Sequence, residues 1–432
     1  MARQMKDSGI PYLGPVPASW DVQKLRYSVK WKSEKGYPDA EVLALYRDYG
    51  VIPKSSRDDN YNVTSLDTST YKYVEVGDFV INKMKAWQGS MGISPYSGII
   101  SPAYHVCAIT NEDIHRPYFH YLLRNVGYLP EFARLSTGLR IGQWDLSFDD
   151  FRNLPFLLPD KPEQERIANL LDTRCADIDK VIEQTCATIE EYKKLKQAII
   201  TEAVTKGVRG ARPMKPSGVE WIGDIPEEWN VCSIKLGVSK VGSGKTPSGG
   251  AEVYLNEGVL FLRSQNIYDT GLQLDNATYI SESTDEEMSS TRVYAGDVLL
   301  NITGGSIGRC CVYPADLPPA NVNQHVCIIR TVNSIFTADY MHYFWISFAG
   351  KTSIQLYQTG GNREGMSADA IKNTLIPRMD ISEQQEITIY LDTKCAEIDR
   401  IIQKKEQLIE ELGSYKKSLI YEYVTGKKEV TA

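Results

Sequence analysis

The chain has 432 residues, of which 42% are hydrophobic and 24% charged, and this composition is typical of a globular protein with roughly two to four domains. The 55 Asp and Glu residues exceed the 48 Lys and Arg residues and give a net charge of -7, so any nucleic-acid surface should be a local patch. The sequence has no apolar run of the roughly 20 residues that cross a bilayer, no apolar core near its start and no CxxC pair, so we expect a cytoplasmic protein without a signal peptide, a zinc site or a disulfide framework.

The first predicted domain covers residues 1–158 and opens with the Gly- and Pro-rich segment MKDSGIPYLGPVPASWDV at 5–22. Runs of alternating apolar residues follow at 70–84 and 105–109, and this pattern predicts short strands joined by turns. A short helix is expected at 118–125. We therefore expect a mixed α/β domain with an antiparallel or curled sheet.

Polar and aromatic side chains gather in two predicted loops of this domain, NKMKAWQGSMG and TGLRIGQWD. Arg, Lys and Gln can pair with base edges in the major groove of DNA, although a solvated surface explains any single one of them equally well. The candidate DNA contacts of the first domain are Lys83, Lys85, Trp87, Gln88, Arg140, Gln143 and Trp144.

The first predicted helical segment covers residues 159–210. Between Glu163 and Lys206 there is no Gly or Pro, and apolar residues recur every three or four positions, which predicts one long helix with an apolar seam. About 43 residues would make a rod of roughly 65 Å. Such a helix needs a partner for its seam, whose predicted members are Leu171, Ile178, Ile182 and Ile189.

The second predicted domain covers residues 211–376 and repeats the opening of the first, because MKPSGVEWIGDIPEEWNV at 214–231 matches 5–22 at a shift of 209 residues. Apolar runs at 259–264, 292–303 and 325–331 predict strands, and a helix is expected at 339–348. Elsewhere the two domains differ strongly. A duplication kept only for stability explains the shared parts but not this divergence, so we expect two different readers on one frame.

The GSGKT run at 242–246 resembles the end of a nucleotide-binding P-loop. The full pattern requires a Gly where Ser239 stands, and Pro247 follows where a helix should continue under the phosphates, so a P-loop-like enzyme is a less favoured alternative. A Gly-rich loop can also lie against a nucleic-acid phosphate. The candidate DNA contacts of the second domain are Lys245, Thr246, Arg263, Ser264, Asn266, Asn301, Thr303, Arg309, Asn362 and Arg363.

The second predicted helical segment covers residues 377–432, and its part 383–425 aligns without a gap with 163–205 at a shift of 220 residues. Lys196 and Lys416 are polar positions in the seams. Because the nearest partner is the other copy, we expect antiparallel pairing and a pseudo-two-fold internal repeat. A parallel pair, pairing with another chain or an ordinary helical hairpin are the other possibilities. The second predicted seam holds Leu391, Ile398, Ile402 and Ile409.

Catalytic signatures are missing from the sequence. It contains no GxSxG, no HExxH, no Cys/His pair at a catalytic spacing and no N/D-P-P-[FYW] tetrapeptide of amino-methylating enzymes. We therefore expect a protein without catalytic residues, metal or cofactor of its own.

Motifs that occur in the same order make the chain similar to specificity subunits of Type I restriction–modification systems, over essentially its whole length. They are SGIPYLGPVPASW and SGVEWIGDIPEEW before the two domains, GSGKTPSGG opening the second domain, and EQERIANLLDT and EQQEITIYLDT opening the two helices. The first domain lacks a GSGKTP-like loop, so we expect its recognition domain to be of a different subtype.

The resemblance implies an α/β (α+β) fold with two mixed α/β target recognition domains separated by two long antiparallel coiled-coil helices. Each domain would read one half of a bipartite double-stranded DNA site, while the helices set the gap and dock two DNA methyltransferase (modification) subunits. S-adenosylmethionine, ATP and Mg are then expected in partner subunits, among them a restriction/translocase subunit. A structural adaptor that does not bind DNA is the alternative.

Overall fold

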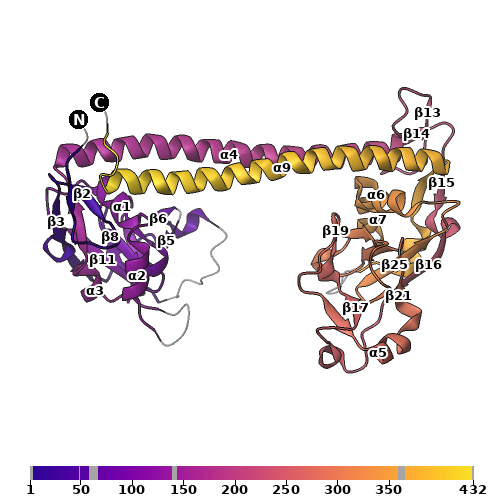
Figure 1. The fold of residues 1–432 in the computed structure, drawn as a ribbon, viewed down its shortest axis with the longest axis horizontal. Coiled ribbons are helices and arrows are strands. Elements are labelled where there is room, and N and C mark those ends of the chain that lie inside the picture. Colours follow the sequence, from indigo (N-terminus) through magenta and orange to yellow (C-terminus); the bar gives the residue numbers. More distant parts are fainter. Residues whose placement is uncertain (1–2, 48, 58–66, 139–143, 359–364, 431–432) are drawn as a thin grey trace. The chain divides into compact units, whose positions relative to one another are not determined.

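The computed structural model describes residues 3–47, 49–57, 67–138, 144–358 and 365–430. The chain forms two compact units, and each is described by itself. Unit 1 comprises residues 1–185 and 406–432, and unit 2 comprises residues 186–405. Each unit contains one mixed α/β domain and part of each of two long helices, as Figure 1 shows.

The domain of unit 1 is built on a four-stranded antiparallel sheet with the order β4-β11-β8-β9. Its strands are β4 (Val29–Lys32), β11 (Tyr104–Ile109), β8 (Phe79–Asn82) and β9 (Met91–Ile93). Four two-stranded ladders surround this sheet. They are β1 (Met5–Asp7) with β2 (Pro15–Pro17), β3 (Asp21–Lys24) with β12 (Pro155–Leu158), β5 (Leu43–Tyr46) with β6 (Gly50–Pro53), and β7 (Lys72–Val74) with β10 (Gly98–Ile100).

The domain of unit 2 contains a four-stranded antiparallel sheet of the same design, with the order β16-β25-β22-β23. Its strands are β16 (Val238–Ser243), β25 (Val326–Thr331), β22 (Val298–Asn301) and β23 (Cys310–Val312). The ladders β13 (Met214–Pro216) with β14 (Asp224–Pro226) and β15 (Asn230–Ser233) with β26 (Leu375–Arg378) repeat β1–β2 and β3–β12 of unit 1. The repeat seen in the sequence is therefore a repeat of topology.

The two domains differ in what they add to this shared frame. Unit 2 has a second sheet, with the order β20-β17-β24-β21, in which β17 and β24 are parallel, and a small β18–β19 ladder. Unit 1 has the β5–β6 and β7–β10 ladders instead. The added strands of unit 2 are β20 (Thr278–Ile280), β17 (Val259–Leu262), β24 (Ala320–Val322), β21 (Arg292–Val293), β18 (Ile267–Tyr268) and β19 (Gly271–Leu272).

The short helices also correspond between the domains. The expected helices at 118–125 and 339–348 are α1 (Arg116–Arg124) and α6 (Ala338–Ile346), and each of the apolar runs predicted as strands contains at least one strand. Helices α2 (Leu129–Leu135) and α3 (Phe148–Arg152) of unit 1 have counterparts in α7 (Phe348–Tyr357) and α8 (Ala368–Asn373), whereas α5 (Glu282–Glu287) belongs to unit 2 alone among the described helices.

The long helices α4 (Lys161–Lys206) and α9 (Ile381–Val424) run antiparallel in both units (Figure 1). In unit 1 the Nζ atom of Lys416 lies 2.6 Å from Asp179, and in unit 2 the Nζ atom of Lys196 lies 2.7 Å from Asp399. Asp179 and Asp399 are equivalent positions of the repeat, and so are Lys196 and Lys416. The antiparallel prediction is confirmed, and the two lysines that interrupt the seams each have an acidic partner on the other helix.

The apolar seam of each helix half packs into the core of its own unit. Leu171 and Ile178 share a buried cluster with Leu419 and Tyr423 in unit 1, and Ile200 shares one with Leu391 in unit 2. The compact units therefore divide each helix between them. Of the predicted seam residues, Leu171, Ile178, Ile189, Leu391 and Ile398 are buried, and Ile182, Ile402 and Ile409 are half-buried.

Each domain is fastened to both long helices by a pair of tyrosines on one short helix, which is α1 in unit 1 and α6 in unit 2. In unit 1 the Tyr118 hydroxyl donates to the carbonyl of Val424 in α9, and the Tyr121 hydroxyl donates to Asp172 in α4. In unit 2, Tyr340 and Tyr343 make the corresponding bonds to Val204 and Asp392. None of the helices that the structure describes combines the length and apolar character needed to span a bilayer.

Candidate nucleic-acid interface

In unit 1 the fold brings the two predicted loops together. The Nζ atom of Lys83 lies 2.9 Å from Asp145, and the backbone carbonyl of Lys83 accepts a hydrogen bond from the amide of Leu146. The ring centroids of Trp87 and Trp144 lie 5.2 Å apart in an edge-to-face arrangement. This arrangement adds stability beyond the area that the rings bury, so the tryptophan pair helps to hold the two loops together.

Of the four remaining candidates of unit 1, two lie within the described residues and two do not. Lys85 is exposed, and Gln88 is half-buried beside it. Arg140 and Gln143 lie outside the described residues. His105, which the sequence analysis did not select, donates from Nε2 to the carbonyl of Leu146, and burial lowers the pKa of its imidazole. A neutral His105 therefore helps to hold the loop that carries Trp144.

A groove in unit 1 contains basic and aromatic residues that the sequence analysis missed. It has a volume of about 520 Å³, and Trp31, which is 51% exposed, lies on its wall. The ring of Trp31 packs at 6.1 Å from that of Phe148. The run LRYSVKWK at 25–32, which mixes basic and aromatic residues, is the part of the sequence that could have indicated this groove. The basic side chains of the groove are Arg26, Lys30 and Arg152.

In unit 2 the GSGKT run is the end of an edge strand. The amide of Gly244 donates to the carbonyl of Val326, and the amide of Lys245 donates to that of Val322. A Cβ atom on Gly244 would lie 1.9 Å from the Val322 oxygen, so glycine is required for this close approach. The segment that follows is a 3-10 turn at Gly250–Val253 rather than an α-helix. These two amides are engaged within the protein, and nothing favours the P-loop alternative.

Four polar side chains of unit 2 form a series of hydrogen bonds that joins three loops. The Thr246 hydroxyl donates to Oε1 of Gln324 at 2.5 Å, and Nε2 of Gln324 lies 3.0 Å from Nε2 of His325. The Nδ1 atom of His325 lies 2.6 Å from the Thr303 hydroxyl. The sequence analysis selected Thr246 and Thr303 but not the two residues that join them, because the 78 positions between Thr246 and Gln324 conceal the contact.

Two predicted contacts of unit 2 are buried. Asn266 is 2% exposed and Asn301 is 0% exposed. The Asn301 amide donates to the carbonyl of Ser264, and Asn266 accepts from the backbone amide of Arg263. Their side chains hold the loops from within, and this burial argues against direct contact with a base.

The two described arginines among the predicted contacts of unit 2 lie on aromatic rings. Arg263 stacks over Tyr254 and donates to the hydroxyl of Thr278 at 2.8 Å, while Arg309 lies 4.5 Å from the ring centroid of Tyr268. Such stacking fixes a guanidinium in place, and both arginines are half-buried. Lys245 is exposed. Asn362 and Arg363 lie outside the described residues.

A second repeated feature anchors each domain at the start of a long helix. In unit 1 the Trp20 indole donates to Glu163 at 2.9 Å, and Arg3 lies 2.7 Å from the same carboxylate. In unit 2 the Trp229 indole donates to Glu383 at 3.0 Å, and Arg212 lies 2.7 Å from it.

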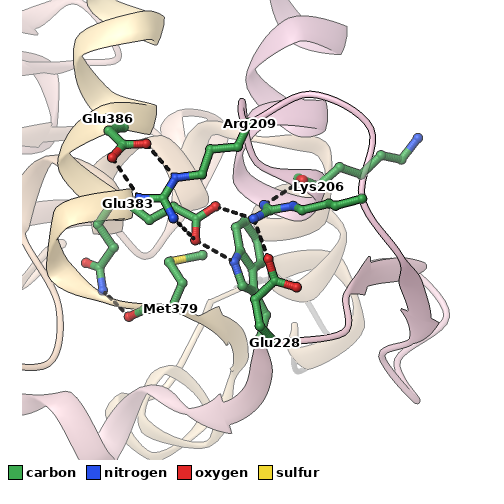
Figure 2. A network of polar contacts seen from close by, with 9 residues as sticks. Lys206, Arg209, Glu228, Met379, Glu383 and Glu386 are labelled. Atoms are coloured by element: carbon green, nitrogen blue, oxygen red, sulfur yellow. Dashed lines mark hydrogen bonds and ion pairs between the residues drawn. The ribbon is translucent and has the colours of Figure 1, made fainter.

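The anchor of unit 2 is larger than that of unit 1. Figure 2 shows Arg209 between Glu383 and Glu386, with Glu228 on the other side of the network. Arg209 bonds Glu386 through two nitrogens at 2.7 Å each. The bond to Arg209 lowers the pKa of the Glu386 carboxyl. The anchors hold two different domains in the same way, so the frame is constant while the surfaces vary.

Comparison with known proteins agrees with this repeat. The family model described as Type I restriction modification DNA specificity domain matches residues 20–191 and again residues 226–411. A putative type I restriction enzyme MjaX specificity subunit of Methanocaldococcus jannaschii is 24% identical over 440 residues, covering 97% of this chain and 96% of the relative. The EcoBI specificity subunit of Escherichia coli is 23% identical over 335 residues, covering 76% of this chain and 69% of the relative.

Solved structures share the fold. A chain from a structure that concerns complex assembly and conformational transition of the type I R-M system matches with a TM-score of 0.72 and 14% identity, covering 96% of this chain and 99% of that one. The HsdS subunit from Thermoanaerobacter tengcongensis matches with a TM-score of 0.52 and 15% identity, covering 96% and 98% of the two chains.

Proposed function

The chain belongs to the family of Type I restriction modification DNA specificity proteins, and we propose that each of its two domains reads one half of a bipartite site in double-stranded DNA. One observation carries the proposal: two domains with the same core sheet and the same anchor differ in the strands and loops that they add to it. A constant frame with two different surfaces suits the reading of two different sequences.

We propose that the paired helices set the gap between the two half-sites. Half-sites read from one face of DNA recur at about one helical turn, roughly 34 Å, and a helical spacer changes length by about 5.4 Å per turn. The paired charges Asp179–Lys416 and Lys196–Asp399 support one register of the two helices over its neighbours. A fixed register gives a fixed gap.

The helices also expose apolar side chains at equivalent positions of the repeat, which supports the docking of two copies of a modification subunit. In unit 1, Val181 and Tyr415 are 42% and 55% exposed, and in unit 2, Ile401 and Leu195 are 36% and 48% exposed. Val181 is equivalent to Ile401 in the repeat, and Leu195 to Tyr415. Two sets of exposed apolar side chains at equivalent positions fit two identical partners.

The chemistry in this proposal belongs to the partner subunits. This chain contributes no catalytic group, while S-adenosylmethionine is bound by the modification subunits and ATP and Mg by a restriction/translocase subunit. The complex then acts in the cytoplasm, where it meets DNA. Weak, salt-sensitive DNA binding by the isolated chain is expected, because the net charge of the whole chain is -7 and only local basic patches can contact the phosphates.

A domain exchange tests the reading function. Residues 227–375 are replaced by the same block of another family member, and the adenines methylated by the complete complex are mapped. We expect a new sequence in one half-site and no change in the other. An unchanged bipartite sequence would instead support the structural adaptor.

A change in helix length tests the spacer. One turn is inserted into both α4 and α9 at equivalent positions of the repeat, and the methylated sites are mapped again. The gap should lengthen while both half-sites keep their sequences. Altered half-sites at an unaltered gap would contradict the spacer role.

A further inference from the structure

Gln324 is exposed at the tip of the turn between β24 and β25, and its side-chain amide is held from both sides. Its Oε1 atom accepts from the Thr246 hydroxyl at 2.5 Å, and its Nε2 atom lies 3.0 Å from Nε2 of His325. An exposed glutamine usually samples many rotamers, because holding one costs side-chain entropy. Here two neighbours from different parts of the chain hold the amide in one orientation.

The supports of this amide are themselves fixed. The backbone turn is closed by Asn323, which is 8% exposed, and its side-chain oxygen accepts from the amide of His325. Thr246 is held in place because the backbone amides of Gly244 and Lys245 bond the strands beneath it. On the far side, the ring of His325 is held by the Thr303 hydroxyl at 2.6 Å. Each residue that supports the amide is therefore itself held by hydrogen bonds.

The hydrogen-bonding capacity of the amide is half used. A glutamine side chain offers two N–H donors and two acceptor positions on its oxygen. The Thr246 hydroxyl occupies one acceptor position, and His325 Nε2 accepts one N–H. One donor and one acceptor therefore remain on this exposed side chain. Adenine presents the complementary pair in the major groove, an N6 amino donor beside the N7 acceptor.

We propose that Gln324 reads an adenine in the half-site bound by the domain of unit 2, with Thr246 and His325 as positioning residues. The proposal rests on the proposed function and deepens it. Two other candidates, Lys245 and Arg309, lie in the adjoining loops and carry positive charge that suits the phosphates. Prior fixing of the amide strengthens the base contact, because little entropy is lost when it forms.

The domain of unit 1 lacks this reader. The residue before His105 is Tyr104, in the position that Gln324 holds before His325, and the ring of His105 bonds the carbonyl of Leu146 instead. Any effect of changing Gln324 should therefore be confined to one half-site. Tyr104→Ala offers a matched control in the other domain.

The test uses the complete modification complex, assembled with wild type, Gln324→Ala, Gln324→Glu or Tyr104→Ala. Methylation of a random-sequence DNA library is mapped, and binding to duplexes with single base-pair changes is measured alongside, so that weakly active variants are also scored. Gln324→Ala should lower the preference for adenine at one position of one half-site by about 10- to 100-fold. Gln324→Glu should shift that preference toward cytosine, whose N4 amino group donates to a carboxylate.

The positioning residues have a separate readout. Thr246→Val and His325→Ala should each reduce the preference at the same base by a few-fold, and neither should reduce it further when Gln324 is already Ala. A merely structural role would add to the Gln324→Ala effect.

Two outcomes overturn the inference and the function separately. If wild type methylates a defined bipartite sequence and Gln324→Ala keeps every position of it at full preference, Gln324 is not a reader. If the wild-type complex shows no sequence preference at all, the proposed function itself fails.

Discussion

Replacing Glu383 by Ala removes the centre of the anchor in unit 2. Glu383 is 3% exposed, and its carboxylate bonds the Trp229 indole at 3.0 Å and the Arg212 guanidinium at 2.7 Å, with Arg209 3.6 Å away (Figure 2). The substitution leaves the indole N–H buried without its acceptor and takes a carboxylate from two arginines. The lost contacts lie where the α/β domain of unit 2 meets the first turn of α9.

The magnitude follows from which partners remain. An unsatisfied buried donor costs about 1–3 kcal/mol, and breaking a buried ion pair costs about 3–5 kcal/mol. Arg212 keeps Glu228 at 2.8 Å and the carbonyl of Lys206 at 3.0 Å, so the lower end of the second range applies. We expect Glu383→Ala to reduce the free energy of unfolding of unit 2 by about 3 kcal/mol. Glu383→Gln keeps an acceptor for Trp229 and should cost about half as much.

Urea unfolding followed by hydrogen–deuterium exchange reports the two units separately and suits this comparison. The matched control is Glu163→Ala, in which Trp20 and the single arginine Arg3 lose the same carboxylate. That variant should destabilise unit 1 by about 2 kcal/mol and leave unit 2 unaffected. A cost below about 1 kcal/mol for Glu383→Ala, or equal losses in both units, would refute the reasoning.

Three further predictions concern stability. Gly413→Ala should stabilise α9 by about 1 kcal/mol in urea denaturation, because no atom lies within 4 Å of the added Cβ and Ala is the better helix former; a destabilised variant would contradict the open space around it. Burial lowers the pKa of His120 to about 3 and that of His342 to about 4, against about 6.5 in the unfolded chain. The folded state therefore keeps both rings neutral, and its stability is highest above pH 6.5. As the pH drops from 6.5 toward 4, the free energy of unfolding should fall by about 1.4 kcal/mol per pH unit for each ring. Unfolding free energies that stay equal at pH 7 and pH 5 would refute this assignment. Gly244→Ala places a Cβ 1.9 Å from the carbonyl oxygen of Val322 and should cost about 1–3 kcal/mol in unit 2, seen as faster amide exchange in β16 and β24; unchanged exchange there would count against the close packing.

Much of the architecture could be predicted because its signals are local or repeated. The uninterrupted seam from Glu163 to Lys206 specifies a helix through spacing alone, and the gapless match to 383–425 specifies a second helix of the same kind. Alternating apolar runs such as 105–109 specify strands in the same way. Lys196 and Lys416 looked like defects of the seam, yet each pairs with an aspartate on the other helix.

The surface residues could be predicted only as groups. Asn266, Asn301 and Gln324 carry the same amide chemistry and lie at the end of a 3-10 helix, at the end of a strand and in a turn, respectively. The first two are buried and hold the loops from within, whereas Gln324 is exposed. Composition cannot separate them, because exposure depends on which loops meet after folding.

The amino-acid sequence by itself determined the duplication, the two long helices, the alternation of constant and variable parts, and thereby the family. Those features depend on periodicity and on similarity between positions of one chain. Only the tertiary structure decided that GSGKT is a strand end packed against Val322, that Trp20 and Trp229 meet the carboxylates of Glu163 and Glu383, and that Thr246 reaches Gln324. The physical reason is distance along the chain: these contacts join residues tens to more than a hundred positions apart, and no local pattern encodes which of them will meet.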